Sequence, residues 1–311
     1  MKKVRSPLFY VGDKYKIMPQ LKEFFPKNIN VFYDVFAGGG SASMAVKAKE
    51  YKMNDINSNI IHLHKYLREQ TSDLNKFLDK MYKLIHYYNL TCSAKGELPE
   101  NFMEVKKKYK KTYYAKINKE GYLRLRNDYN LNQDNMDLLY LLLVFGFNHM
   151  TRFNKAGEFN LPVGNVDWNK NVENALKNYA QFSNENKITL YNQDFEEFIL
   201  KQKIGDQDFL YFDPPYLITF SEYNKLWNNE TESRLYNLLD ELNSKNIKWG
   251  LSNVFTHKGK KNDILQGWVK KNNYYVYPIK SNYISRFDNS IKEDTTEVLI
   301  MNCKGEEMTN G

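Results

Sequence analysis

The sequence predicts an α/β fold in which a mostly parallel sheet is interrupted by a long, mainly helical insertion. Short β-branched and aromatic runs, bounded by turn residues, have the length and composition of buried strands. Four runs share these features: 31–36, 51–53, 187–191 and 208–212. Two mainly helical stretches separate the second run from the third, at 59–90 and 97–148. Strands that alternate with helices in this way build parallel sheets from βαβ units.

Composition limits the class of protein. The 311 residues, 42% of them hydrophobic and 26% charged, suffice for one large domain or two smaller ones. A net charge of +8 favours an acidic partner such as nucleic acid, although codon bias gives a similar excess of lysine. The two cysteines and five scattered histidines have no metal-ligand spacing, so we expect no metal. The N-terminus lacks the apolar part of a signal peptide, and no apolar run approaches the roughly 20 residues that span a bilayer. We therefore expect a cytoplasmic protein without a membrane partner.

The run at 31–36 ends in a glycine-rich turn that suits a nucleoside ligand. Gly38, Gly39 and Gly40 let the backbone approach a ligand closely, and a helix-compatible stretch follows. Asp55 follows the next strand, where Rossmann-like sheets carry an acid for ribose hydroxyls. The absence of GxGxxG and of Gly-Lys-Ser/Thr after the turn favours a nucleoside without a pyrophosphate. A plain tight turn at the glycines and a helix cap at Asp55 are the alternatives.

The tetrapeptide Asp213-Pro214-Pro215-Tyr216 follows the run at 208–212 directly. Ligands bind outside the carboxyl ends of parallel strands, so this turn is expected at the active edge of the sheet. The exocyclic amine of a nucleobase is a poor nucleophile, because its lone pair is delocalised into the ring. The Asp213 carboxylate and the Pro214 carbonyl are two acceptors for the amine hydrogens, which would localise that lone pair for methyl transfer. Tyr216 offers a stacking face for a base flipped out of a duplex. A plain strand-ending turn is the alternative.

The rest of the chain is punctuated by turns and further strands. The Gly, Asn and Pro residues of 146–164 indicate a turn-rich hairpin. A helical pattern at 229–244 precedes an expected strand at 247–252. Two further strands, linked by a polar connection, are expected to pair antiparallel: 273–279 and 296–302.

The separation of the glycine turn from the tetrapeptide indicates an inserted domain. Gly38 and Asp213 are 175 residues apart, roughly 100 more than the intervening sheet strands and helices need. Ten Lys and Arg against five Asp and Glu between Lys95 and Asp128 suit contacts with phosphates, although a solvated helix face has the same composition. The expected parts are a catalytic domain, 1–57 and 165–311, and an inserted recognition domain, 58–164.

Six segments together resemble the Dam-like, D12 class (α group) of adenine-N6 DNA methyltransferases over nearly the whole chain. Residues 9–15 are similar to the family's N-terminal motif, 34–41 to its cofactor loop and 54–57 to the segment with its ribose-binding acid. Residues 147–164 are similar to its DNA-contacting hairpin, 192–195 to the segment near the cofactor's adenine and 213–216 to its catalytic tetrapeptide. Asp13 and His149 stand where the family usually has glycine. The segment 165–167 lacks the basic and aromatic residues that GATC-reading relatives often carry, so no target sequence is predicted.

The resemblance implies a Rossmann-like, seven-stranded methyltransferase sheet that binds S-adenosylmethionine. The catalytic residues it implies are Asp213, Pro214 and Tyr216. The cofactor-binding residues are Tyr10, Lys14, Phe36, Gly38, Gly40, Ser41, Asp55, Asp194 and Phe195. The DNA-binding residues are Asn148, Arg152, Asn160 and Pro162. These hairpin residues are equally suited to bracing the hairpin itself, and Asp194 is nearly as well suited to starting a surface helix.

We therefore expect a site-specific DNA methyltransferase that acts on the N6 amine of a flipped-out adenine in double-stranded DNA. We expect a monomer, because one copy of each motif suffices for one transfer. The enzyme is expected to act either beside a separate restriction endonuclease or as an orphan methylase. The alternatives are transfer to cytosine N4 or to RNA, a catalytically idle nucleic-acid-binding subunit, and a dinucleotide oxidoreductase. The Dam-like hairpin favours adenine, the intact tetrapeptide disfavours an idle subunit, and the glycine pattern argues against an oxidoreductase.

Overall fold

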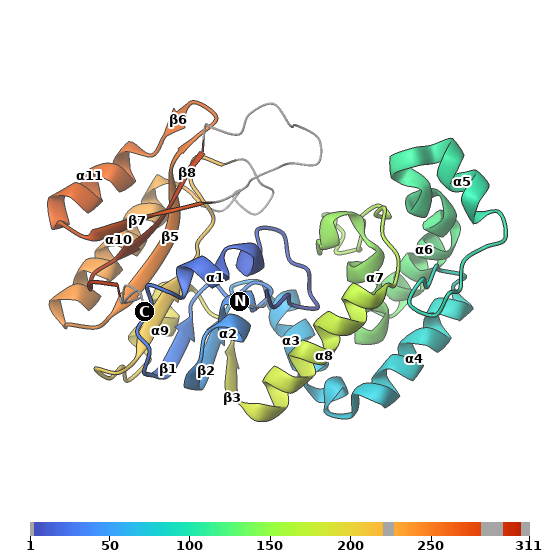
Figure 1. The fold of residues 1–311 in the computed structure, drawn as a ribbon, viewed down its shortest axis with the longest axis horizontal. Helices are drawn as coiled ribbons and strands as arrows, with labels where there is room; N and C mark the ends of the chain where they lie inside the picture. Colours follow the sequence, from blue (N-terminus) through green and yellow to red (C-terminus); the bar gives the residue numbers. More distant parts are fainter. Residues whose placement is uncertain (1–2, 220–226, 281–294, 306–311) are drawn as a thin grey trace, which may run out of the picture. The chain divides into compact units, whose positions relative to one another are not determined.

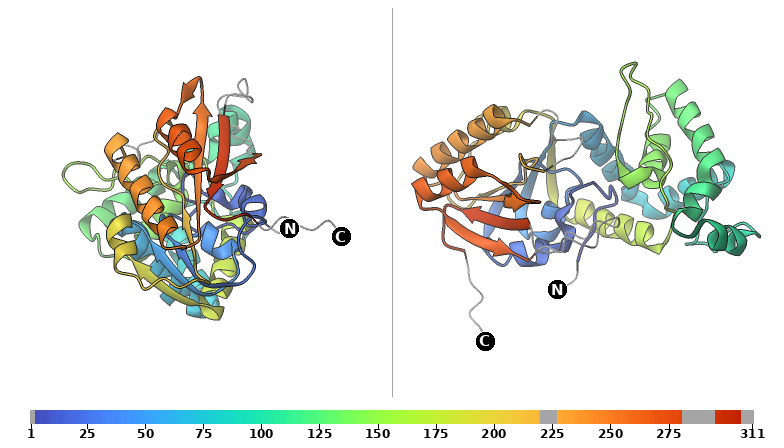
Figure 2. Two further views of the ribbon diagram at one scale, coloured as in Figure 1. Left: turned by 90° about the vertical axis from the view of Figure 1, so that its left-hand side faces the viewer. Right: turned by 90° about the horizontal axis from the view of Figure 1, so that it is seen from above.

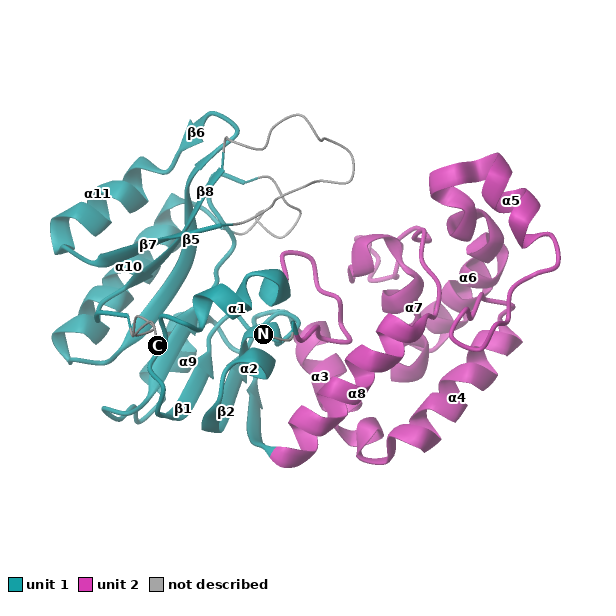
Figure 3. Cartoon of the chain, viewed as in Figure 1, with its two compact units in different colours: residues 1–3, 14–57, 186–311 teal, residues 4–13, 58–185 magenta. Residues whose placement is uncertain are grey.

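The structure, a computed structural model, describes residues 3–219, 227–280 and 295–305. The chain divides into two compact units (Figure 3). Unit 1 contains residues 1–3, 14–57 and 186–311, and unit 2 contains residues 4–13 and 58–185. Unit 2 therefore includes residues on both sides of the expected insertion, 58–164. The catalytic and recognition roles expected for the two parts of the chain stay predictions.

Unit 1 is built on one mixed sheet, with eight strands in the part of the chain that is described. Seven of them follow the order β3-β2-β1-β4-β5-β8-β7, and the short strand β6 pairs with β5 (Figure 1). The first five in this order are parallel, whereas β8 pairs antiparallel with β5 and β7. The strands are β1 Ile29–Asp34, β2 Ala48–Asn54, β3 Lys187–Tyr191, β4 Phe209–Phe212, β5 Trp249–His257, β6 Lys260–Lys261, β7 Tyr275–Ile279 and β8 Thr295–Met301. The expected α/β fold and the antiparallel pair at its end are confirmed. The polar connection before β8 lies mostly outside the described residues.

Alternating side chains of the central strand β4 face the two sides of the sheet, as the strand period requires. Leu210 and Phe212 belong to a buried core that also holds residues of α9, α10 and α11. Figure 2 shows these three helices on the same side of the sheet. Phe209 and Tyr211 instead contact Phe25, at ring-centroid distances of 4.7 and 5.3 Å. The helices of unit 1 are η1 Lys14–Lys16, α1 Met18–Leu21, α2 Ser41–Ala45, α9 Phe195–Leu200, α10 Asn229–Ser244 and α11 Asp263–Asn272.

Unit 2 is mainly helical, around a central apolar helix. Every residue of α7 from Leu138 to Phe145 is buried. The helical stretch expected at 97–148 contains three α-helices, because Lys110 has a positive φ and Asn135 caps the start of α7. The helices are α3 Ser58–Gln70, η2 Thr71–Asp73, α4 Leu74–Tyr87, α5 Phe102–Tyr109, η3 Lys110–Thr112, α6 Tyr113–Leu131, α7 Met136–Phe145, η4 Phe147–His149 and α8 Lys170–Glu185. No helix among the described residues combines the length and apolar character needed to cross a bilayer.

The segment 146–164 folds back on itself, as expected for a hairpin, but it makes few ladder hydrogen bonds. At its tip the side-chain oxygen of Asn154 accepts from the backbone N–H groups of Ala156 and Glu158, each at 2.9 Å. This turn provides a local hydrogen-bond acceptor for the two backbone N–H groups. Two isolated antiparallel bridges join the two arms: Gly146 with Val163, and Phe153 with Phe159.

Gly121, in the middle of α6, allows this helix to touch the backbone that follows α4. A Cβ at this position would lie 1.9 Å from the backbone oxygen of Tyr88. We expect Gly121→Ala to lower the free energy of unfolding by roughly 2 kcal/mol or more, because backbone must move to admit the methyl group. Urea unfolding followed by circular dichroism measures the change.

Gly267, an exposed glycine of α11, is the matched control. A Cβ there would meet no atom within 4 Å. Gly267→Ala should raise the free energy of unfolding by about 0.5–1 kcal/mol, because alanine is the better helix former. Equal stability of the wild type and Gly121→Ala would contradict the close packing of α6.

Candidate active site

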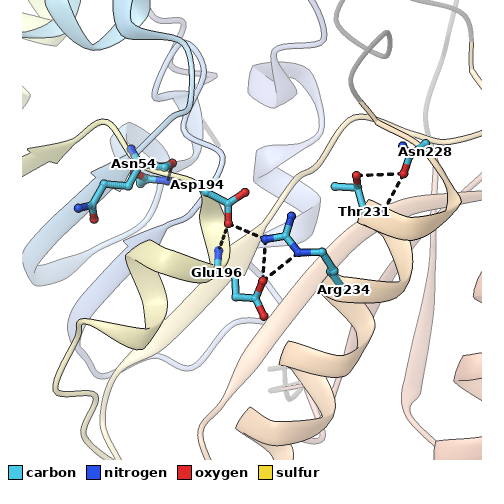
Figure 4. Close-up of polar contacts among 7 residues, drawn as sticks. Asn54, Asp194, Glu196, Asn228, Thr231 and Arg234 are labelled. Atoms are coloured by element: carbon cyan, nitrogen blue, oxygen red, sulfur yellow. Dashed lines mark hydrogen bonds and ion pairs between the residues drawn. The ribbon is translucent and has the colours of Figure 1, made fainter.

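Asn54, the last residue of β2, lies at the carboxyl edge of the sheet, near Asp194 (Figure 4), and its side chain connects two loops. Its Nδ2 donates to the backbone oxygens of Val35 at 3.1 Å and Gln193 at 3.0 Å. Its Oδ1 accepts from the backbone N–H of Gln193 at 3.0 Å. Asn54 is buried, so losing these bonds would leave polar groups unsatisfied. The loops after β1 and β3 are therefore both held against the end of β2.

The glycine turn after β1 lies against Asp55, as its spacing from that acid predicted. Gly38 and Gly40 have φ values of 47° and 78°, the left-handed region that glycine tolerates best. The N–H of Gly38 donates to Asp55 Oδ2 at 2.9 Å, and the N–H of Asn57 donates to Asp55 Oδ1 at 2.8 Å. Burial raises the pKa of Asp55, and these two hydrogen bonds oppose the rise. Each carboxylate oxygen keeps lone pairs for a ligand hydroxyl.

Asp34 is a buried acid at the same edge that was not among the expected site residues. Its Oδ2 accepts from the backbone N–H and the hydroxyl of Ser43, at 3.2 and 2.7 Å. Burial raises the pKa of Asp34 to about 7, while the Ser43 hydrogen bonds lower it and the charges of Asp213 and Asp55 add to the rise. The signal in the sequence is an acid within the otherwise apolar run VFYDVF.

Asp213 follows β4 and forms a compact cluster with Lys14 and Tyr216. Lys14 Nζ lies 3.1 Å from Asp213 Oδ1, and the Tyr216 hydroxyl donates to the same oxygen at 3.1 Å. Lys14 Nζ also lies 4.7 Å from the centroid of the Tyr216 ring. Burial raises the pKa of Asp213, and the charge and hydrogen bond of Lys14 oppose that rise. The cluster brings together one expected cofactor residue and two expected catalytic residues.

Two further groups complete this cluster. Pro214 is buried, and its carbonyl accepts no hydrogen bond from any residue that the structure describes. Glu297, in β8, is buried and its Oε1 accepts from the Tyr216 hydroxyl at 3.3 Å. Glu297 was missed from the sequence, where a single acid within the strand TTEVLIM is the only local signal.

A second cluster lies where β3 ends. Asp194 caps α9, and its Oδ1 accepts from the backbone N–H of Glu196 at 3.0 Å, so the helix-start interpretation of Asp194 is confirmed. The Phe195 ring lies 5.5 Å from the ring of Phe36. The Trp227 ring lies 5.6 Å from Phe36 and 5.9 Å from Phe195. An acid and a group of aromatic rings thus lie side by side beyond the carboxyl edge.

The expected DNA-binding residues hold the hairpin of unit 2 together. Arg152 Nε donates to Asn160 Oδ1 and Arg152 Nη2 donates to the Asn160 carbonyl, both at 2.9 Å. The Pro162 carbonyl accepts from the backbone N–H of Phe147 at 2.9 Å. Asn148 is exposed, with a φ of 53°. This geometry is that of hairpin bracing, and contact with DNA stays a prediction.

The residues at the carboxyl edge of unit 1 fit a nucleoside cofactor. Carboxylates suit hydroxyl and amine donors, and the aromatic rings suit a flat base. The turn at the glycines has no lysine and hydroxyl pair to cradle a chain of phosphates, and α2 after it is only five residues long. Tyr10 belongs to unit 2. The other expected cofactor residues belong to unit 1: Lys14, Phe36, Gly38, Gly40, Ser41, Asp55, Asp194 and Phe195.

The sequence profile of the D12 class N6 adenine-specific DNA methyltransferases matches residues 10–283. The chain therefore belongs to the D12 class family of N6 adenine-specific DNA methyltransferases, as its motifs predicted.

Several curated proteins are similar to the chain. It is 35% identical over 309 residues to the modification methylase StsI of Streptococcus sanguinis. This alignment covers 97% of this chain and 43% of StsI. The chain is 31% identical over 307 residues to the type II methyltransferase M.FokI of Planomicrobium okeanokoites, with coverage of 96% and 43%. It is 25% identical over 219 residues to the DNA adenine methylase of Escherichia coli K12, with coverage of 70% and 66%. The chain thus spans less than half the length of the first two relatives.

The raised pKa of Asp34 predicts a pH-dependent stability. At pH values below 3.8, the ordinary pKa of an aspartate, the raised pKa of Asp34 contributes its full stabilisation to the fold. This contribution is lost as the pH rises through about 7, the pKa of Asp34 in the folded protein. Asp34→Asn keeps an oxygen acceptor for Ser43 but cannot ionise. We expect its stability relative to the wild type to rise across that pH range, by up to about 4 kcal/mol.

Urea unfolding at a series of pH values measures this difference. Asp79→Asn, at an exposed acid of α4, is the control and should show no comparable rise. A constant difference in stability between Asp34→Asn and the wild type would show that Asp34 ionises as readily in the fold as in water.

Proposed function

We propose that this chain transfers the methyl group of S-adenosylmethionine to the N6 amine of an adenine flipped out of double-stranded DNA. The observation that carries the proposal is the turn Asp213-Pro214-Pro215-Tyr216 at the carboxyl edge of the sheet, in which Pro214 and Tyr216 are buried. The strand before it, β4, is the direct neighbour of β1, which leads into the glycine turn. Ligands of such sheets bind at this edge, so an amine and a methyl donor can meet there.

The turn matches the chemistry of the adenine amine. That amine has two hydrogens, and the turn offers two acceptors, the Asp213 carboxylate and the Pro214 carbonyl. Both favour the form of the amine with its lone pair on nitrogen, and both stabilise the positive charge that develops there. Because burial raises the pKa of Asp213, its carboxylate is also a better acceptor than an exposed one for the proton that N6 must lose.

Lys14 and Tyr216 support this chemistry. The ammonium of Lys14, 3.1 Å from Asp213, favours the ionised carboxylate that accepts the hydrogen bond. The Tyr216 ring is the stacking surface proposed for the flipped base, and Asp213 and Glu297 hold its hydroxyl. A base removed from a duplex loses its stacking partners, and an aromatic ring replaces part of that energy.

S-adenosylmethionine, when bound, supplies a methyl group on a sulfonium centre. Asp55 is proposed to hold the ribose hydroxyls, and Asp194 with Phe195 the adenine ring. These assignments rest on the position of the residues beyond the carboxyl edge and on family resemblance. The remaining residues proposed to enclose the cofactor are Tyr10, Lys14, Phe36, Gly38, Gly40 and Ser41.

The relatives suggest the setting in which the chain acts. StsI and M.FokI are named as a modification methylase and a type II methyltransferase, which supports a restriction–modification role beside a separate endonuclease. The proposal includes action as a monomer and in the cytoplasm. It also includes recognition of DNA by the helical unit, through Asn148, Arg152, Asn160 and Pro162 of its hairpin.

Sequencing of native DNA tests the reaction directly. The chain is expressed in a methylation-deficient host, and its DNA is read by single-molecule sequencing. We expect N6-methyladenine within one short sequence, reduced at least about a hundredfold by Asp213→Ala, because one of the two acceptors is lost. Asp206→Ala, at an exposed acid before β4, should leave the modification intact. N4-methylcytosine would overturn the substrate, and unmodified DNA would overturn the reaction.

The contact between Lys14 and Asp213 predicts a shift in the pH profile. Activity should fall with decreasing pH as Asp213 becomes protonated, at a pH above the ordinary pKa of an aspartate, about 4. Lys14→Met removes the positive charge that lowers the pKa of Asp213. The acid limb of kcat/KM should therefore move to higher pH.

Lys16→Met, at an exposed lysine two residues away, is the matched control for this shift and should leave the acid limb in place. Methyl transfer to an oligonucleotide, measured across pH, compares the variants. An acid limb in the same place for Lys14→Met and the wild type would contradict the role of Lys14.

A further inference from the structure

Arg234, in α10, joins two acids at the start of α9 (Figure 4). Its Nη2 donates to Asp194 Oδ1 at 2.9 Å and to Glu196 Oε2 at 2.6 Å. Its Nε donates to the same Glu196 oxygen at 2.9 Å. Arg234 is 40 residues from Asp194 in the sequence, and neither the glycine turn nor the tetrapeptide indicates it.

The two oxygens of the Asp194 carboxylate have different hydrogen-bond partners. Oδ1 accepts from the backbone N–H of Glu196 and from Arg234. Oδ2 accepts no hydrogen bond from any residue that the structure describes. Two donors on one oxygen fix the rotation of the carboxylate, so the direction in which Oδ2 presents its lone pairs is also fixed.

Arg234 also contacts the aromatic residue that follows Asp194. Its guanidinium carbon lies 5.1 Å from the centroid of the Phe195 ring, within cation–π range. Phe195 in turn lies beside Phe36 and Trp227. One side chain of α10 therefore holds both the carboxylate and the ring at the end of β3.

The helix α10, which carries Arg234, is held by a cap at its start and by buried leucines. Asn228 caps the helix, and its Oδ1 accepts from the N–H of Thr231 at 2.9 Å and from the Thr231 hydroxyl at 3.1 Å (Figure 4). Leu235 and Leu239 on the same helix are fully buried in the core of unit 1. Arg234 therefore extends from a rigid helix, which a positioning role requires.

We propose that Arg234 is a positioning residue for recognition of the cofactor's adenine: it aims Asp194 Oδ2 at the exocyclic amine and holds the Phe195 ring beside the base. This inference rests on the proposed function, which places S-adenosylmethionine at this edge of the sheet. It adds a residue on α10 that acts through Asp194 and Phe195, and it predicts discrimination between an amine and a carbonyl on the purine.

A role in stability alone does not account for the arrangement. The side chains of Arg234, Asp194 and Glu196 are 41%, 37% and 36% exposed. Ion pairs with this exposure contribute little to the stability of a fold. The contacts do restrict the conformations of the Asp194 carboxylate, and such preorganisation acts on ligand affinity.

The test compares two ligands that differ at one group of the purine. S-adenosylhomocysteine carries the amine, and S-inosylhomocysteine carries a carbonyl in its place, which would repel the Asp194 carboxylate. Isothermal titration calorimetry measures the Kd of each ligand for the wild type, Arg234→Met and Arg234→Lys. Lys201→Met, which removes the partner of Glu197 on α9, is the matched ion-pair control. Thermal unfolding of each variant without ligand reports stability separately.

We expect Arg234→Met to raise the Kd of S-adenosylhomocysteine roughly fivefold or more, since a fivefold change corresponds to one well-placed contact. The Kd of S-inosylhomocysteine should rise by a smaller factor, because this ligand has no amine to donate to Asp194 and loses only the effect of Arg234 on the Phe195 ring. The melting temperature should stay close to that of the wild type. Arg234→Lys should restore part of the affinity, and Lys201→Met should match the wild type with both ligands.

The outcomes separate this inference from the function on which it rests. If the wild type prefers S-adenosylhomocysteine and Arg234→Met keeps the same preference, the positioning role is wrong while the proposed function stands. Equal losses of affinity for both ligands, accompanied by a lower melting temperature, would also overturn it in favour of a structural role. If the wild type binds neither ligand, the proposed cofactor and the positioning role both fail.

Discussion

The amide of Asn54 lies at the carboxyl edge of the sheet between the loops that follow β1 and β3, because β2 lies between these two strands. Its Nδ2 and Oδ1 atoms bond to the backbone of the loops that follow both neighbours. An aliphatic residue could fill the same space but could not satisfy these buried backbone groups. The glycine turn, Asp55 and Asp194 are therefore held in fixed positions relative to one another by one side chain.

The same edge gathers acids in a low-dielectric environment. Burial raises the pKa values of Asp34, Asp55 and Asp213, and each carboxylate is stabilised by a different set of partners. Asp34 has the Ser43 hydroxyl and Asp55 has two backbone N–H groups, whereas Asp213 has the ammonium of Lys14. Asp213 is thus paired with a full charge, and this pairing keeps a buried carboxylate available as an acceptor.

Side chains from the far half of the sheet and its helices then orient the groups at the edge. Glu297 holds the Tyr216 hydroxyl, and Arg234 holds Asp194. The hairpin of unit 2 is braced in a comparable way, by the paired hydrogen bonds between Arg152 and Asn160. At the carboxyl edge, the residue proposed to contact a ligand is thus held by a partner that is not itself proposed to contact one.

The sequence by itself determined the order of strands and helices and the identity of the loops at the carboxyl edge. Both follow from local patterns: a short apolar run predicts a buried strand, and glycine or proline directly after it predicts a turn. The break at Lys110 did not follow, because lysine seldom adopts a positive φ. The break before α7 was missed although Asn135 is a local helix-start signal, since its side chain accepts from the N–H three residues later.

Only the tertiary structure decided which side chains meet. Lys14 reaches Asp213, Glu297 reaches Tyr216 and Arg234 reaches Asp194, all across long separations in the chain. These contacts depend on the strand order β3-β2-β1-β4-β5-β8-β7 and on the face that each residue presents. No local periodicity encodes either property, since the free energy of such contacts comes from packing and desolvation in the assembled core.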